Sequence, residues 1–176
     1  MKIALVVLLT AILLSSCLPA YKPALTLADK QCGLLSIAWS PDGASIAVSS
    51  SNPPALKLYD AKSGAVLKSF ELGENFMDDL AFSPDGSSII SKGDTGDIVV
   101  WELASGKAKR VIKKTGKPAQ NIALSPDGKT IAMSYLVKKG EQDMRIDILD
   151  YASGAVLLSL GGHDEMITHL AFLPDG

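Results

Sequence analysis

The residues that could perform catalysis or bind a metal are few, and their spacing does not support either role. Asp94-Thr95-Gly96 spells the triplet of aspartic proteases, but it occurs once. Proton sharing in such enzymes needs two carboxylates, so this triplet is interpreted as a turn. His163 and His169 lie six residues apart, whereas a zinc motif on a helix needs histidines four residues apart. Neither pattern predicts a catalytic or metal site.

Four aspartates recur along the chain in Pro-Asp-Gly triplets, at Asp42, Asp85, Asp127 and Asp175. They could suggest calcium ligands, but each belongs to a separate turn. No phosphate-binding glycine loop, dinucleotide fingerprint or nucleophile elbow is present. The sequence therefore predicts no catalytic residue, no metal site and no cofactor.

Cys17 is the one residue for which the sequence predicts covalent chemistry. It follows Lys2, an apolar run from Ile3 to Leu14 and two serines, which are the parts of a secretory signal. The run of 12 residues would span about 18 Å as a helix, less than the ~30 Å hydrocarbon core. A membrane-spanning helix is therefore disfavoured. Ordinary cleavage after Ala20 stays as an alternative, although it would put the bulky Leu18 at a small-residue site.

Leu14-Ser15-Ser16-Cys17 resembles the lipobox of bacterial lipoproteins. The resemblance implies a signal peptide at residues 1–16, acylation of Cys17 and a lipid-attached linker at residues 17–22. The lipid bilayer is then one partner of the chain, because multiple acyl chains hold a protein firmly. Leu18 after the cysteine implies the outer membrane, facing the periplasm, within the bacterial cell envelope.

The elements that follow are repeats. Pro-Asp-Gly glycines at 43, 86, 128 and 176 are 43, 42 and 48 residues apart, and Ser-Gly pairs at 63–64, 105–106 and 153–154 keep the same phase. Before each Pro-Asp-Gly turn, an alanine stands between two large apolar residues, which indicates a strand. Proline and glycine suit the short turn between that strand and the next apolar run. Each repeat therefore predicts four short strands.

Four strands in about 42 residues is the period of a propeller blade. The pattern of an apolar strand, Ser-Pro-Asp-Gly, an aromatic–acidic pair such as Trp101-Glu102 and a Ser-Gly turn resembles the WD40-repeat family. The resemblance covers residues 23–176 and implies an all-β propeller. One departure is clear: a Gly-His pair that this family uses as a polar tether occurs only at Gly162-His163.

The predicted blades are 33–72, 77–114 and 118–161, with a partial fourth blade at 162–176 that holds one strand, Ile167 to Phe172. Pro23 to Ala28 is interpreted as the outer strand of a closing blade. These strands do not close a ring. The chain is therefore expected to be the N-terminal part of a longer propeller, a truncated product without function, an arc completed by self-association, or an arc that is stable alone.

The predicted function is a non-catalytic protein–protein interaction scaffold, whose protein or peptide partner the sequence does not name. The inner strands carry Ser36, Asp79, Asn121 and His169 at one repeat position, which do not form a catalytic cluster. An enzyme whose site lies in further blades stays as the alternative. The formal charge of −2 argues against a nucleic-acid partner. Weak candidates for partner-binding loops are Phe76, Met77, Lys113, Lys114, Lys117, Lys138 and Lys139.

Overall fold

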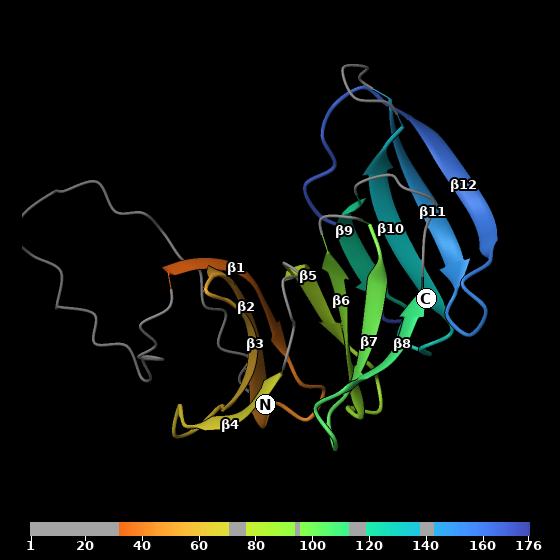
Figure 1. The fold of residues 1–176 in the computed structure, drawn as a ribbon. Coiled ribbons are helices and arrows are strands. Elements are labelled where there is room, and N and C mark those ends of the chain that lie inside the picture. The colour runs from red at the N-terminus through yellow and green to blue at the C-terminus, as the bar shows by residue number, and fades with distance from the viewer. Residues whose placement is uncertain (1–31, 71–76, 94–95, 113–118, 138–142) are drawn as a thin grey trace, which may run out of the picture.

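The computed structural model describes residues 32–70, 77–93, 96–112, 119–137 and 143–176. In this part of the chain all regular structure is β, and no helix is long and apolar enough to cross a membrane. Three four-stranded sheets follow one another (Figure 1). The strands are β1 (Cys32–Trp39), β2 (Ser45–Asn52), β3 (Pro54–Asp60), β4 (Val66–Phe70), β5 (Met77–Phe82), β6 (Ser88–Gly93), β7 (Ile98–Glu102), β8 (Ala108–Ile112), β9 (Ala119–Leu124), β10 (Thr130–Leu136), β11 (Met144–Asp150) and β12 (Val156–His163).

Each sheet is an antiparallel meander in which every strand pairs with the next one along the chain. The Pro-Asp-Gly turns make the first connection. In the first turn, the Ser40 carbonyl accepts from the Gly43 N–H at 2.9 Å, and Gly43 has φ of +70°. Glycine adopts this left-handed conformation without steric cost. Gly86 and Gly128 close their turns in the same way, which confirms the sequence interpretation of the repeated triplet.

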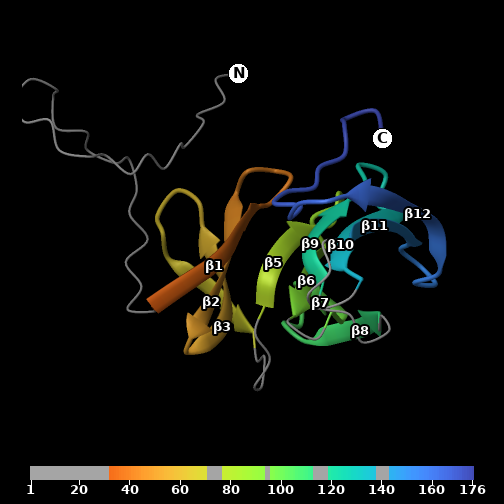
Figure 2. The same cartoon turned by 90° about the horizontal axis from the view of Figure 1, so that it is seen from above.

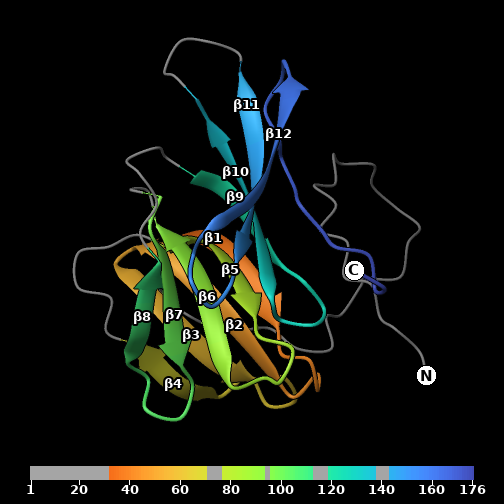
Figure 3. The ribbon, with the colours of Figure 1, turned by 90° about the vertical axis from the view of Figure 1, so that its right-hand side faces the viewer.

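The sheets stand side by side as the blades of an open arc (Figure 2). The first strand of each sheet lies innermost, so that β1 packs on β5 and β5 packs on β9. The strands β4, β8 and β12 lie at the outer edges, as the turned view also shows (Figure 3). The large–small–large pattern before each turn therefore falls on the inner strands, as expected. The three blades of the predicted propeller are thus present.

The two larger apolar clusters lie between blades, and a small third cluster lies within the first blade. One cluster joins Leu56 and Phe70 of the first blade to Met77 and Trp101 of the second. Another joins Ile112 of the second blade to residues of the third blade. Each blade therefore depends on a neighbour to bury its faces.

The two ends of the arc show what happens without that neighbour. Leu80 of β5 is buried, but Ile37, which holds the equivalent position in β1, is 62% exposed. At the other end Leu160 of β12 is 43% exposed, whereas Phe70 and Ile112 hold the equivalent positions and are 5% and 6% exposed. The sequence pattern is the same in these positions. The exposure therefore arises because, in the described part of the chain, no further blade packs on these two end faces.

The predicted strand Ile167 to Phe172 is not a strand in the structure. Residues 164–172 form no ladder, although Pro174 and Gly176 still form the following turn. A strand needs a paired neighbour to satisfy its backbone groups, and no described residue pairs with this segment. The predicted outer strand Pro23 to Ala28, the signal peptide and the linker lie outside the described residues.

Candidate functional site

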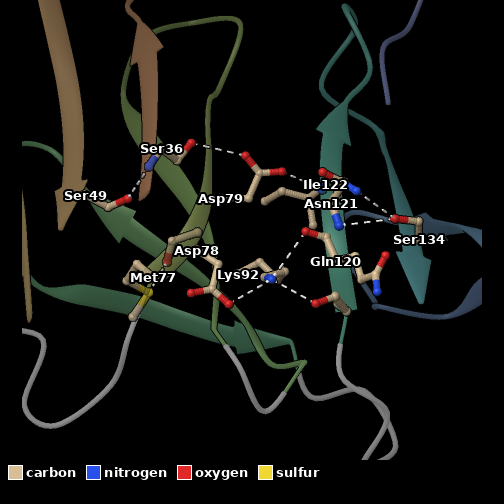
Figure 4. Close-up of polar contacts among 12 residues, drawn as sticks. Ser36, Ser49, Met77, Asp78, Asp79, Lys92, Gln120, Asn121, Ile122 and Ser134 are labelled. Atoms are coloured by element: carbon tan, nitrogen blue, oxygen red, sulfur yellow. Dashed lines mark hydrogen bonds and ion pairs between the residues drawn. The ribbon is translucent and has the colours of Figure 1, made fainter. Parts of the chain in front are cut away.

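The inner strands carry three of the four polar side chains that the sequence placed at one repeat position, and the fourth, His169, lies in the segment after β12, which forms no strand. In β1, β5 and β9 the strand register shifts just before Ser36, Asp79 and Asn121. Such a bulge leaves an unpaired residue and turns its neighbour. Here it aims the next polar side chain toward the adjacent blade (Figure 4). These residues form what we call the inner polar belt: Ser36, Asp79 and Asn121 with their partners Ser49, Lys92 and Ser134.

Asp79 is the centre of the inner polar belt because it touches both neighbouring blades. Its Oδ1 accepts from the Ser36 hydroxyl of the first blade at 3.2 Å, and its Oδ2 accepts from the Ile122 N–H of the third blade at 2.9 Å (Figure 4). The N–H of the adjacent Leu80 also donates to Oδ1, at 2.9 Å. One carboxylate therefore links three blades.

Serines at one repeat position of the second strands satisfy the N–H groups freed by the bulges. Ser49 Oγ accepts from the Ser36 N–H at 3.1 Å, and Ser134 Oγ accepts from the Asn121 N–H at 3.1 Å. The Asn121 amide also reaches forward and donates to the Ile167 carbonyl at 2.6 Å. That bond holds the segment after β12 against the inner edge of the third blade.

Lys92 replaces serine at this position in the second blade. Its ammonium group donates to Asp78 Oδ2 at 3.1 Å and to the Ala119 and Gln120 carbonyls of the third blade at 2.8 and 3.3 Å (Figure 4). The Lys92 side chain is only 3% exposed. A buried charge is costly unless it is paired and hydrogen-bonded, and these three acceptors meet that need. Lys92 thus links two blades.

The belt joins blades and shows no catalytic arrangement. Asp79 is engaged by donors on both sides, and the side chains that Ser36 contacts are those of Ser49 and Asp79 rather than a histidine or lysine. Nucleophilic catalysis requires a base within hydrogen-bonding reach of the nucleophile. Within the described ranges, no group of three or more histidine, cysteine or acidic residues is placed to hold a metal.

A second set of hydrogen bonds between blades starts from the outer strands and was not predicted from the sequence. Lys68 of β4 donates to the Leu103 and Ala104 carbonyls in the turn of the next blade, at 2.7 and 2.6 Å. Arg110 of β8 donates to the Tyr151 and Ala152 carbonyls of the third blade and lies 4.8 Å from the centre of the Tyr151 ring. Both cations stand four residues after a Ser-Gly glycine. Their common position in the repeat is the sequence pattern that could have predicted these links.

The exposed turn aspartates act locally. The Ser83 hydroxyl, with the Ser87 N–H and hydroxyl, lowers the pKa of Asp85 from 3.8 to about 2. Asp42 and Asp127 also have lowered pKa values, because the Ser40 and Ser125 hydroxyls donate to them in the same way. Each carboxylate thus stabilises its own turn, as expected from the sequence.

The predicted partner-binding loops are placed only in part. Met77 is 1% exposed, because it lies in β5 between the first two blades, where its sulfur accepts from the Ser91 hydroxyl at 2.8 Å. The prediction that Met77 belongs to a partner-binding loop is therefore wrong. The remaining predicted loop residues, Phe76, Lys113, Lys114, Lys117, Lys138 and Lys139, lie outside the described residues, as do Asp94, Thr95 and the predicted lipidation site Cys17.

Comparison with known proteins supports the repeat interpretation. The model of the family described as eukaryotic translation initiation factor eIF2A matches residues 22–165. Nuclear distribution protein PAC1 of Arthroderma benhamiae is 30% identical over 154 residues, which cover 78% of this chain and 33% of that protein. WD repeat-containing protein SL1-17 of Schistosoma mansoni is 26% identical, over 82% of this chain and 45% of that protein. The chain spans about a third to a half of these curated relatives.

A solved structure shares the fold. A chain of Kuenenia stuttgartiensis hydrazine synthase superimposes with a TM-score of 0.63 and 25% sequence identity. The match covers 74% of this chain and 37% of that chain. The three-blade arc thus matches about a third of that chain.

Proposed function

Because the chain belongs to the family described as eukaryotic translation initiation factor eIF2A and is a WD40-like propeller sequence, we propose that it is a non-catalytic protein-interaction scaffold. The observation that carries the proposal is the inner polar belt. Its carboxylate and lysine side chains join one blade to the next, and its amide holds the segment after β12 against the third blade. Such a frame is rigid on the inside and leaves its turns and loops for binding a protein or peptide.

We propose further that the scaffold is tethered to the bacterial cell envelope through acylated Cys17. The lipobox-like Leu14-Ser15-Ser16-Cys17 supports this tether, and Leu18 supports an outer-membrane position facing the periplasm. The test is fractionation of cells that make the wild-type chain or its Cys17→Ser variant. Wild-type chain should stay in the membrane pellet after a carbonate wash, and the variant should be soluble. A variant that still sediments with membranes contradicts the tether.

The partner itself is proposed to be a protein or peptide, with nucleic acid disfavoured by the formal charge of −2. The test is crosslinked capture from an envelope extract with the full chain as bait. Replacing Lys113, Lys114 and Lys117 together by serine should reduce recovery of a specific partner. Lys57→Ser, on a strand rather than a loop, is the matched control. Capture of the same proteins by an unrelated propeller contradicts the scaffold proposal.

One observation favours a second candidate. The matching solved chain belongs to hydrazine synthase, whose name is that of an enzyme. The arc would then be the opening part of a propeller enzyme whose active site lies in further blades. Intact-mass measurement of the native protein separates the two proposals, because an enzyme of this kind requires a chain much longer than residues 17–176.

A further inference from the structure

A groove opens between neighbouring Pro-Asp-Gly turns at the edge of the first two blades. Pro41 and Asp42 form one wall, Pro84 and Asp85 form the other, and Phe82 and Leu103 lie between them. The groove encloses about 420 Å³. The two turns come close together at its end, because a Cβ on Gly86 would lie 3.8 Å from Pro41 Cδ. The groove is therefore produced by the packing of one blade on the next.

The same groove recurs where the third blade meets the last turn. It encloses about 530 Å³, and its lining includes Pro126, Asp127, Phe172, Pro174 and Asp175. Phe82 and Phe172 stand at the same repeat position, four residues before the turn glycine. Both grooves therefore combine a phenylalanine, two prolines and two aspartates. Because the groove recurs with the same residue types, its shape follows from the repeat and not from the conformation of a single turn.

The charge of the first groove is one-sided. Asp42 and Asp85 are both exposed, and the serine hydroxyls beside them hold their pKa values below the ordinary range. The lining contains no lysine, arginine or histidine. The groove therefore presents two negative charges beside an aromatic and proline surface near neutral pH.

We propose that the groove between the first two Pro-Asp-Gly turns binds a lysine or arginine side chain of an extended segment in a protein partner. The aliphatic stem of such a side chain can cover Phe82 and Leu103 while its charged end reaches Asp42 and Asp85. A bare calcium ion fits less well, because it needs six to eight oxygen ligands and much of this lining is apolar. The inference rests on the proposed scaffold function and names the chemistry of its partner.

The probe is the peptide acetyl-Gly-Leu-Arg-Leu-Gly-amide, and its matched control carries citrulline, which has nearly the shape of arginine but no charge. Binding to the ¹⁵N-labelled full chain is followed by NMR titration in low salt. We expect weak binding of the arginine peptide, with shifts centred on the two turns. The citrulline peptide should bind roughly three- to tenfold more weakly, since each exposed ion pair contributes little.

Variants of the chain locate the site. The double substitution Asp42→Asn with Asp85→Asn removes both charges, but leaves amide oxygens to accept the turn bonds, and should lower affinity to the level of the citrulline peptide. Asp60→Asn is the matched control, because Asp60 accepts the same kind of bonds in a turn that does not line the groove. It should leave affinity unchanged. Melting temperatures of the variants confirm that each is folded.

Equal binding of the two peptides, or an equal loss in Asp60→Asn, would overturn the inference. So would the absence of binding at millimolar peptide. A partner captured equally well by wild type and by the double variant would overturn the groove while leaving the scaffold function intact. The two proposals therefore fail separately.

Discussion

Removal of the Asp79 carboxylate tests whether the inner polar belt holds the blades together. In Asp79→Ala, the Ile122 N–H loses its acceptor at 2.9 Å and the Ser36 hydroxyl loses one at 3.2 Å. A hydrogen bond to a charged group contributes about 1.5–3 kcal/mol, and a neutral one about 1 kcal/mol. Because the Ser36 contact is long and the site is only partly buried, we expect a total loss of about 2–4 kcal/mol.

The conservative substitution Asp79→Asn makes the test specific. The asparagine oxygen can accept from the Ile122 N–H while its amide donates to the Ser36 hydroxyl, which also accepts hydrogen bonds. Both links between blades are then retained without the charge. We therefore expect Asp79→Asn to cost about 1 kcal/mol, well below the cost of the alanine variant.

The assay is urea unfolding of the full chain, followed by far-ultraviolet circular dichroism and by fluorescence of the buried Trp101. A loss of 2–4 kcal/mol would lower the melting temperature by roughly 4–16 °C in a domain of this size. Asp164→Ala, on the exposed segment after β12, is the control for removal of an acidic side chain. If Asp79→Ala costs no more than Asp164→Ala, the belt does not join the blades and the reasoning is refuted.

Three further predictions follow from the contacts between blades and in the turns. Phe70→Ala should cost about 3–5 kcal/mol in urea unfolding, whereas Leu160→Ala should cost under about 1 kcal/mol because its side chain is 43% exposed. Arg110→Ala should lower the melting temperature and Arg110→Lys should recover only part of it, since lysine lacks the planar fork that reaches two carbonyls. Asp85, with its pKa lowered from 3.8 to about 2, adds stability above pH 3.8 that is lost as the pH falls toward 2. Asp85→Asn should therefore flatten the pH dependence of the free energy of unfolding in this range. An unchanged pH dependence in the variant would contradict the assigned turn bonds.

The sequence predicted the blades because their signals are local. Pro-Asp-Gly and Ser-Gly turns, with alternating apolar residues between them, act within a few residues of one another, so their phase is visible in the chain. The three sheets have the predicted order. The strand expected at Ile167 to Phe172 did not form for a non-local reason, since its sequence has the right alternation but none of the described strands pairs with it.

The candidate site was less predictable, because its contacts join residues about one repeat apart. The sequence placed Ser36, Asp79 and Asn121 at one repeat position, but the bulges that aim them at the next blade have no marked sequence signal. Lys92 was not singled out from the sequence, and it is buried. Met77 was predicted as a partner-binding loop residue, yet it lies in a strand that the first blade covers. In each case burial depends on the neighbouring blade.

The arrangement also explains how the arc manages without the polar tether of its relatives. The resemblance implied a Gly-His pair bonded within each blade, and the first three blades lack it. In the second blade, Trp101 instead donates its indole N–H to Ser91 at 2.7 Å. Further polar links run between blades, through Asp79 on the inside and Lys68 and Arg110 on the outside. Stability in this arc is therefore a property of each joint between blades. It follows that damage to one joint should loosen both blades beside it, whereas an exposed end face can change with little effect on the rest.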